Sequence, residues 1–147
     1  MVIDINNITF KNRLPIQLRM TDIDALHHVN NGVICSYFDL GRLHYMKAVS
    51  GAFELKDIDI VLVHTEYDFS ASIRFNDTIA VDTAILEFGT KSVKMVQRIV
   101  NTATNKCYCT CYSVLAGYDH QRDSSAPIKE EFKRKVMAYE RKQTTKK

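Results

Sequence analysis

The hydrophobic and polar positions of this chain follow two periods, one typical of strands and one typical of a helix. Residues 15–20 alternate apolar and polar side chains, which predicts a half-buried strand. Between residues 33 and 48, apolar residues recur at steps of three and four around much of the helical circumference. We therefore predict a long helix that a sheet wraps. Gly41 lies inside its apolar stripe, where a missing side chain would let the helix approach the sheet closely.

After this helix the pattern predicts four further strands joined by short turns. Ser50 and Gly51 are predicted to end the helix, because glycine is common just after the last turn. Strands are expected at residues 60–73, 79–88, 92–101 and 107–118. Pro127 is expected to be the first residue of a short amphipathic helix. Its apolar side would hold Phe132, Val136 and Tyr139.

These elements predict an α+β fold in which a five-stranded antiparallel sheet wraps around one long helix. The length of 147 residues suits one domain over residues 1–147. The edges of such a sheet carry unpaired backbone groups that favour pairing with another chain. We therefore expect a homo-oligomer built by edge-to-edge pairing.

The composition is that of a globular protein, with 46% hydrophobic and 25% charged residues. The segment from Lys129 onward holds eight Lys or Arg and three Glu, a net +5; the whole chain carries +3, so the first 128 residues carry −2. We interpret the basic segment 127–147 as a solvated helix and tail, and predict no nucleic-acid partner. No apolar run reaches the roughly 18 residues of a membrane span, and residues 1–7 do not resemble a secretion signal. We expect a cytoplasmic protein without membrane contact.

Three of the four cysteines alternate along the last predicted strand. Cys107, Cys109 and Cys111 would then point to one face. Three cysteines on one strand make a poor tetrahedral cage for zinc. The chain shows no secretion signal, which argues against disulfides. We interpret the thiols as small apolar residues and predict neither a zinc site nor a disulfide.

The densest group of polar side chains lies at residues 22–31, directly before the long helix. Asp22 and Asp24 are two residues apart, a spacing that suits acid or base chemistry and also occurs in turns and helix caps. A metal site is the alternative for this cluster, but neighbouring histidines on a short loop seldom converge on one ion. We predict no metal, and we expect Asp22 to have a structural role.

The start of the helix supplies a second chemical feature. Asn30 or Asn31 is predicted to cap it, and the amides of Asn31, Gly32 and Val33 would point back toward the loop. Such amides form an oxyanion site, and the helix dipole adds to it. A carboxylate beside an oxyanion site suits hydrolysis of an activated acyl group, so Asp24 is our candidate base or nucleophile.

His28 and Asn30 are candidates to orient the water or hold the substrate carbonyl, while Gly32 would let that carbonyl approach the backbone. For the two histidines of the cluster, a structural or capping role is the alternative.

The residues of this cluster and its helix resemble a known signature. Asp22-x-Asp24-x-x-x-His28-Val29-Asn30-Asn31, followed by Tyr37, Asp39 and Arg42, is similar to the motif of acyl-CoA thioesterases of the 4-hydroxybenzoyl-CoA thioesterase type, which have the hot-dog fold. Weaker similarities follow in the same order as in that family: Asp68-Phe69, Arg74 to Asp77, Gly89 to Ser92, and Pro127 to Glu131. Together they span residues 14 to 136.

The resemblance implies hydrolysis of acyl-CoA or acyl carrier protein thioesters, with Asp24 as the catalytic carboxylate and an amide near Asn31 polarising the carbonyl. It implies a homodimer or homotetramer with the active site between subunits. Lys91 and Ser92 would contact the CoA moiety, a cation and a hydroxyl being suited to phosphate or pantetheine. CoA enters as part of the substrate, and no other cofactor is expected.

The chain departs from the family pattern most clearly at His27, where the family has glycine. Histidine is expected to remove the freedom to adopt a positive φ and to narrow or redirect access to the pocket, which affects substrate preference more than reaction type. The competing functions are a hot-dog protein that binds acyl thioesters without turnover and a hot-dog dehydratase. The position of Asp24 ahead of the helix argues against the dehydratase.

Overall fold

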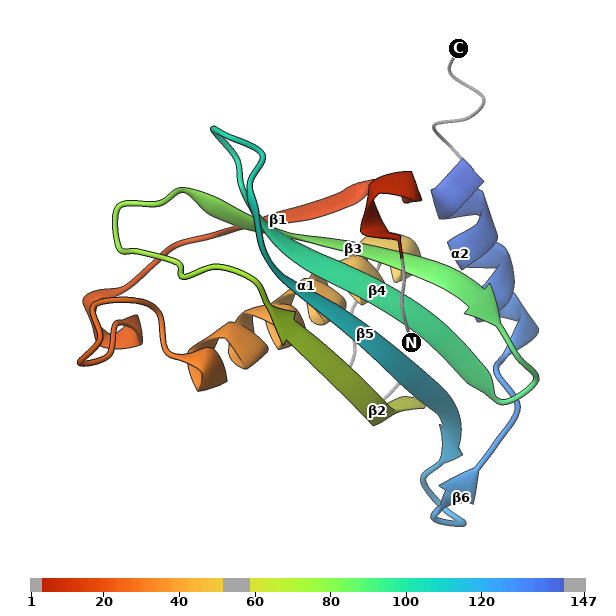
Figure 1. The fold of residues 1–147 in the computed structure, drawn as a ribbon. Helices are drawn as coiled ribbons and strands as arrows, with labels where there is room; N and C mark the ends of the chain where they lie inside the picture. The colour runs from red at the N-terminus through yellow and green to blue at the C-terminus, as the bar shows by residue number, and fades with distance from the viewer. Residues whose placement is uncertain (1–3, 52–58, 142–147) are drawn as a thin grey trace.

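The computed structural model describes residues 4–51 and 59–141, and Figure 1 shows a curled sheet around one long helix. In chain order the elements are η1 (Ile5–Asn7), β1 (Asn12–Ile16), η2 (Met20–Asp22), α1 (Asn31–Ser50), β2 (Ile60–Phe69), β3 (Ile79–Phe88), β4 (Ser92–Asn101), β5 (Cys107–Asp119), β6 (Ser124–Ser125) and α2 (Glu130–Arg141). Neither α-helix in these two ranges is long and apolar enough to cross a membrane.

The sheet has the order β1-β3-β4-β5-β2, and all neighbours in it are antiparallel. The short strand β6 pairs with the end of β5. Register shifts occur in β2 between Leu62 and His64 and in β3 between Ile85 and Glu87. Such bulges bend a strand and increase its twist, which helps the sheet to curl around α1.

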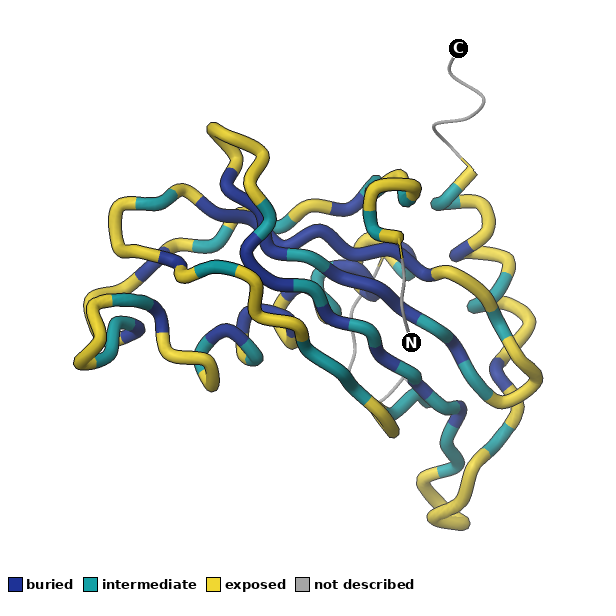
Figure 2. Tube along the Cα trace, in the orientation of Figure 1, coloured by how far each residue is buried: buried dark blue, intermediate teal, exposed yellow. Residues whose placement is uncertain are grey.

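Helix α1 packs its apolar stripe against the concave face of the sheet, as predicted. Among the described residues the core has two clusters, one around Phe38 in the first half of α1 and one around Tyr45 in the second half. Figure 2 shows that burial is concentrated in the central strands and on the inner side of α1. Gly41 makes the close approach that its position predicted, because a Cβ there would lie only 2.5 Å from Val81 Cγ1.

The boundaries of α1 confirm the predicted helix signals. Asn30 is the N-cap, and Gly51 follows the last turn with a φ of 76°. The loop predicted after it falls mostly on residues 52–58, which lie outside the described residues.

Three predicted boundaries are wrong. The first strand is Asn12–Ile16 and not 15–20, and Pro15 lies inside it, which an edge strand tolerates. The strand predicted at residues 60–73 is β2, which ends at Phe69, since the amides of Ser70 and Ala71 both bond the carbonyl of Tyr108. The last helix begins at Glu130, because the amide of Ile128 bonds the carbonyl of Thr90 and holds the preceding segment extended.

The prediction that three cysteines share one face is also wrong. A register shift between β4 and β5, with Tyr108 of β5 as the extra residue, places Cys107 opposite Val100 and Cys109 opposite Ile99. Because Ile99 and Val100 are consecutive residues of a strand, their partners lie on opposite faces. Cys109 and Cys111 are buried on the α1 side, where burial raises the pKa of both thiols.

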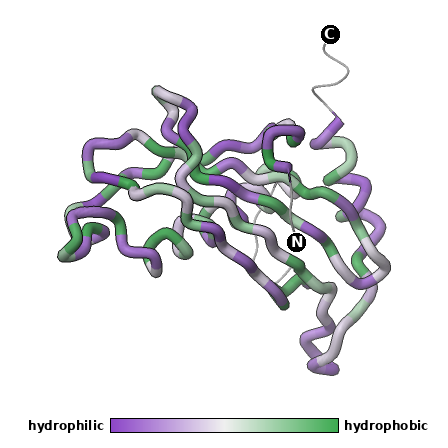
Figure 3. The backbone as a smooth tube through the Cα atoms, in the orientation of Figure 1, coloured by the Kyte–Doolittle hydropathy of each residue, from purple (hydrophilic) through white to green (hydrophobic). Residues whose placement is uncertain are grey.

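Helix α2 covers the second core cluster, and Figure 3 shows hydrophobic and hydrophilic residues alternating along it. Its predicted apolar side is confirmed, because Phe132, Val136 and Tyr139 all pack against that cluster. The hydroxyl of Tyr45, a buried residue of α1, donates a 2.5 Å hydrogen bond to Glu140 Oε2. This bond ties the end of α2 to the second half of α1.

Candidate functional site

Residues 22–30 form a short hairpin that leads into α1. Ile23 and Val29 make an antiparallel bridge, and the Asp24 amide donates to the His28 carbonyl at 3.1 Å. At the base of the hairpin the Asn30 amide donates to the Asp22 carbonyl at 3.0 Å. Since paired residues of a hairpin are close neighbours, this arrangement brings Asp24 beside His28 and near the start of α1.

The first turn of α1 presents backbone amides next to this hairpin. The side chain of Asn30 accepts from the Gly32 amide at 2.8 Å, so that amide is occupied by the cap in this structure. Of the three amides expected to form the oxyanion site, that of Gly32 is therefore not available in this structure. Asn31 and Val33 also belong to the first turn, where an N–H has no carbonyl four residues earlier inside the helix to accept its bond. These two amides, together with the helix dipole, form a site for developing negative charge.

Asp24 is half-buried, and its carboxylate is held by the hairpin itself. Its Oδ1 accepts from the Leu26 amide at 2.9 Å, an Asx-type turn. Within the described residues, no hydrogen bond engages the other carboxylate oxygen. A fixed carboxylate with one available oxygen can take a proton or attack an electrophilic carbon.

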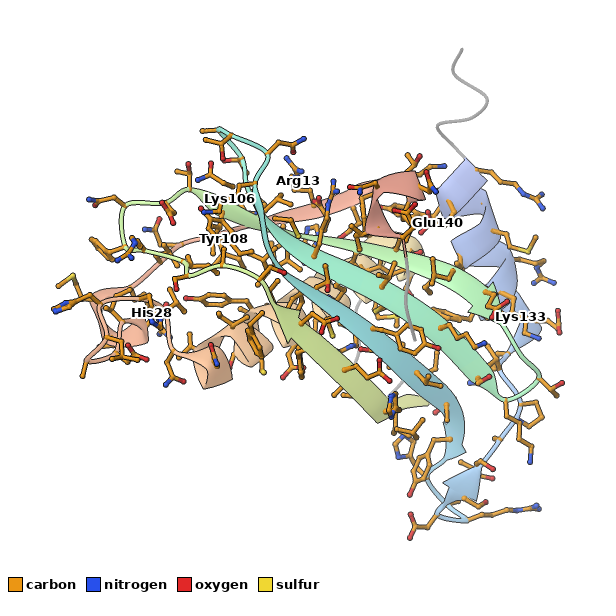
Figure 4. All side chains as sticks on the ribbon, viewed as in Figure 1. Arg13, His28, Lys106, Tyr108, Lys133 and Glu140 are labelled. Atoms are coloured by element: carbon orange, nitrogen blue, oxygen red, sulfur yellow. The ribbon has the colours of Figure 1, made fainter. Side chains whose placement is uncertain are left out.

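The two histidines lie at the tip of the hairpin and on its returning arm. His27 is exposed and has a φ of 67°, so it adopts the left-handed conformation that glycine favours. The prediction that histidine would remove this conformation is wrong. His28 is half-buried, with Nδ1 3.5 Å from the Val29 carbonyl oxygen, and Figure 4 shows it just ahead of α1, at the end of the molecule away from α2.

Asp22 is buried, with 2% of its surface exposed, and has the structural role that was expected. Its carboxylate accepts from the Tyr37 hydroxyl at 2.6 Å, the Arg19 amide at 3.1 Å and Arg19 Nη2 at 3.2 Å. Burial tends to raise the pKa of Asp22, but these hydrogen bonds outweigh it and hold the pKa below its ordinary value. Asp22 is therefore an ionised anchor at neutral pH.

An aromatic wall that the sequence reasoning missed runs along β2 beside the first half of α1. The rings of Phe38 and Tyr67 are 5.6 Å apart, and those of Tyr67 and Phe69 are 6.1 Å apart and nearly parallel. Phe69 remains 44% exposed. The hairpin joins the same region, because the Val29 amide donates to the Ile73 carbonyl at 2.8 Å. The alternation of Tyr67 and Phe69 along one strand was the signal available in the sequence.

Lys91 lies in the turn between β3 and β4, and Ser92 is the first residue of β4. Gly89 lies in the same turn, and its amide donates to the Ser92 carbonyl at 2.8 Å. Figure 1 shows this turn beside α2, at the end of the sheet away from the start of α1. A ten-residue strand, the length of β3, spans roughly 30 Å. The structure of this chain therefore brings Asp24, His28, Asn30, Asn31 and Gly32 together but leaves Lys91 and Ser92 apart from them.

Comparison with known proteins agrees with this architecture. The sequence model of the thioesterase-like superfamily matches residues 18–136. A thioesterase from Thermus thermophilus, solved with coenzyme A and zinc, is 26% identical over 89% of this chain and 95% of that chain, with a TM-score of 0.80.

Two more distant solved structures share the fold. A 1,4-dihydroxy-2-naphthoyl-CoA thioesterase from Synechocystis is 14% identical over 86% of this chain and 95% of its own, with a TM-score of 0.77. A Staphylococcus aureus protein solved with CoA is 13% identical over 92% and 88%, with a TM-score of 0.78. A search of curated protein sequences finds no match. The antiparallel sheet curled around α1 is the hot-dog fold, and the chain belongs to the thioesterase-like superfamily.

Proposed function

We propose that this protein hydrolyses acyl-CoA or acyl carrier protein thioesters, as an enzyme of the 4-hydroxybenzoyl-CoA thioesterase type acting in the cytoplasm. The observation that carries the proposal is the hairpin of residues 22–30, which joins a carboxylate, Asp24, to the capped start of a buried helix. The thioesterase-like family and the CoA-bound relative at 26% identity support the substrate class. CoA enters as part of the substrate, and no separate cofactor is proposed.

In the proposed reaction Asp24 acts as a general base. It takes a proton from water, the resulting hydroxide adds to the thioester carbon, and the carbonyl oxygen becomes an oxyanion at the Asn31 and Val33 amides. The C–S bond then breaks, and the thiolate recovers the proton from the Asp24 carboxyl. The alternative has Asp24 attack the carbonyl carbon itself, so that the C–S bond breaks, the CoA thiolate leaves and a mixed anhydride forms. Water then hydrolyses the anhydride to the free acid and regenerates the Asp24 carboxylate; the proton released goes to the thiolate.

Three neighbours of Asp24 are proposed to prepare the site. His28, half-buried on the opposite arm, would orient the water. Asn30 fixes the first turn through its cap, and Gly32 leaves the carbonyl room to approach, since it carries no side chain. Tyr67 and Phe69, backed by the buried ring of Phe38, would hold the acyl group.

We propose a homodimer formed through β2, with a tetramer as a further step. In the described part of the chain β2 pairs with β5 alone, so its other edge is open. Beside this edge α1 exposes Leu40 and Leu43, at 49% and 43%, and β2 itself exposes Leu62 and Val63, at 41% and 59%. An open edge flanked by apolar side chains favours pairing with a second copy.

Such a dimer would also complete the site. Antiparallel pairing of two β2 strands reverses one sheet relative to the other, so the far end of one subunit lies on the same side as the hairpin of its partner. Lys91 and Ser92, which are remote from Asp24 within a subunit, would then be available to the CoA moiety bound at the partner's hairpin. Lys91 is exposed and could pair with a phosphate.

The test is thiol release from benzoyl-CoA, hexanoyl-CoA and dodecanoyl-CoA, measured with the wild type and with Asp24→Asn. Hydrolysis of at least one thioester by the wild type, and its loss in the variant, is the expected result. Binding without thiol release from any of them would instead identify an acyl-thioester-binding protein. Light scattering that finds a stable monomer would contradict the proposed dimer and its shared CoA contacts.

A further inference from the structure

We propose that Tyr37 is a positioning residue, which fixes the hairpin of residues 22–30 on α1 through the buried carboxylate of Asp22. The inference rests on the proposed function. Tyr37 lies in the second turn of α1, with 4% of its surface exposed, and its hydroxyl donates to Asp22 Oδ2 at 2.6 Å. Asp22 in turn is the first residue of the hairpin.

The main chain of Asp22 carries the base of the hairpin. Its carbonyl accepts from the Asn30 amide at 3.0 Å, and the bridge between Ile23 and Val29 follows directly. Asp24 is the next residue. A displacement of Asp22 is therefore passed on to Asp24 over two residues of paired backbone.

Two side-chain hydrogen bonds join this hairpin to α1 in the described part of the chain. One is the Asn30 cap on the Gly32 amide, at the first turn, and the other is the bond from Tyr37 to Asp22. The two contact points on α1, Gly32 and Tyr37, are five residues apart, which is about 7.5 Å along a helix. The Val29 amide also bonds the Ile73 carbonyl, but this bond holds the returning arm of the hairpin. In the described part of the chain, the bond from Tyr37 is the side-chain hydrogen bond by which α1 holds the first arm, which carries Asp22 and Asp24.

The electrostatics of the pair fit this task. Burial and the nearby Asp22 carboxylate raise the pKa of Tyr37, so its phenol keeps the proton that it donates. Asp22 is held ionised by Tyr37 and by the two donors of Arg19. Without the phenol hydroxyl, the buried carboxylate of Asp22 loses its bond to α1. It then retains only the bonds from Arg19, which lies three residues earlier in the chain and is not part of α1. Since an error of about 1 Å in the placement of a reacting group costs on the order of 100-fold in rate, such a release would be visible in kcat.

Helix α1 offers a matched control. Tyr45 is another buried tyrosine, with no exposed surface, and it too donates to a carboxylate, Glu140, but at the other end of the helix. Tyr37→Phe and Tyr45→Phe each remove one buried tyrosine-to-carboxylate hydrogen bond. A purely structural role for Tyr37 predicts the same behaviour in both variants.

The experiment measures kcat and KM for acyl-CoA hydrolysis, together with amide hydrogen exchange by NMR, in the wild type and both variants. Tyr37→Phe is expected to lower kcat by 10- to 100-fold with KM changed by less than threefold, and to speed exchange of the Asp24 and Asn30 amides at least tenfold. Tyr45→Phe is expected to change neither kcat nor the exchange rates of these two amides by more than twofold. Asp22→Asn keeps an amide oxygen for the Tyr37 hydroxyl, so its kcat should fall less than that of Tyr37→Phe.

Equal kcat and equal exchange in the two tyrosine variants would overturn the proposal. An Asp22→Asn variant with a larger loss of kcat than Tyr37→Phe would also contradict it. The exchange measurement needs no substrate. Faster exchange confined to the hairpin in Tyr37→Phe would therefore support the anchoring role even if the wild type hydrolysed no thioester, a result that would reject the proposed function alone.

Discussion

The backbone of His27 gives a quantitative test of the hairpin geometry. Its φ of 67° lies in the left-handed region, which costs a residue with a Cβ about 1–2 kcal/mol. Glycine avoids this cost but loses about 0.4–1 kcal/mol through the greater freedom of the unfolded chain. Comparing His27→Gly with His27→Ala cancels the loss of the imidazole. The glycine variant should therefore be more stable than the alanine variant by about 1 kcal/mol.

Urea unfolding followed by circular dichroism measures this difference, which corresponds to about 2–4 °C in Tm for a chain of this length. His28 is the control, because it is the adjacent histidine and is not among the described non-glycine residues with a positive φ. There the order should reverse, with His28→Gly about 0.5–1 kcal/mol less stable than His28→Ala. If His27→Gly proved less stable than His27→Ala, the left-handed conformation of the hairpin tip would be wrong.

Three further predictions concern the anchor, the helix contact and the dimer. Hydrogen bonds depress the folded-state pKa of Asp22, so its ionised form stabilises the fold above about pH 4, and this contribution is lost as the pH falls further. The Tm of Asp22→Asn should therefore fall less between pH 7 and pH 3 than the Tm of the wild type. Gly41→Ala should lower the free energy of unfolding by about 1 kcal/mol, since overpacking against Val81 at about 1–3 kcal/mol exceeds a gain of about 1 kcal/mol in helix propensity; Val81→Ala in the same chain should reduce this loss, and a stabilised Gly41→Ala would refute the close contact. Leu43→Lys should halve the mass found by light scattering, whereas Met137→Lys, an equally exposed position on α2, should leave it unchanged.

Features determined by neighbouring residues could be predicted from the sequence. Asn30 and Gly51 delimit α1 through local hydrogen bonding and a positive φ, and both boundaries are confirmed. The grouping of Asp24 with the start of α1 was also predictable, because only a short hairpin separates them. Residues that are close in the sequence are also close in space in this part of the chain.

Features that depend on distant contacts could not be predicted in the same way. The segment after Pro127 is held extended by the carbonyl of Thr90, a contact that no local pattern shows. Cys107 changes face because the pairing of β5 with β4 shifts by one residue. The separation of Lys91 from Asp24 follows from the direction of β3 in the folded sheet, and their proposed meeting requires a second chain.

The central claim is that Asp24 performs the chemistry at the start of α1. Its most direct test is the first-order rate of thiol release from the best acyl-CoA substrate under single-turnover conditions, compared between the wild type and Asp24→Asn. Asparagine keeps the size and the hydrogen bond to the Leu26 amide but cannot act as a base or nucleophile. We expect the variant to release thiol about 10²–10⁴-fold more slowly than the wild type, with an unchanged Tm. An Asp24→Asn protein that released thiol at the wild-type rate would contradict it.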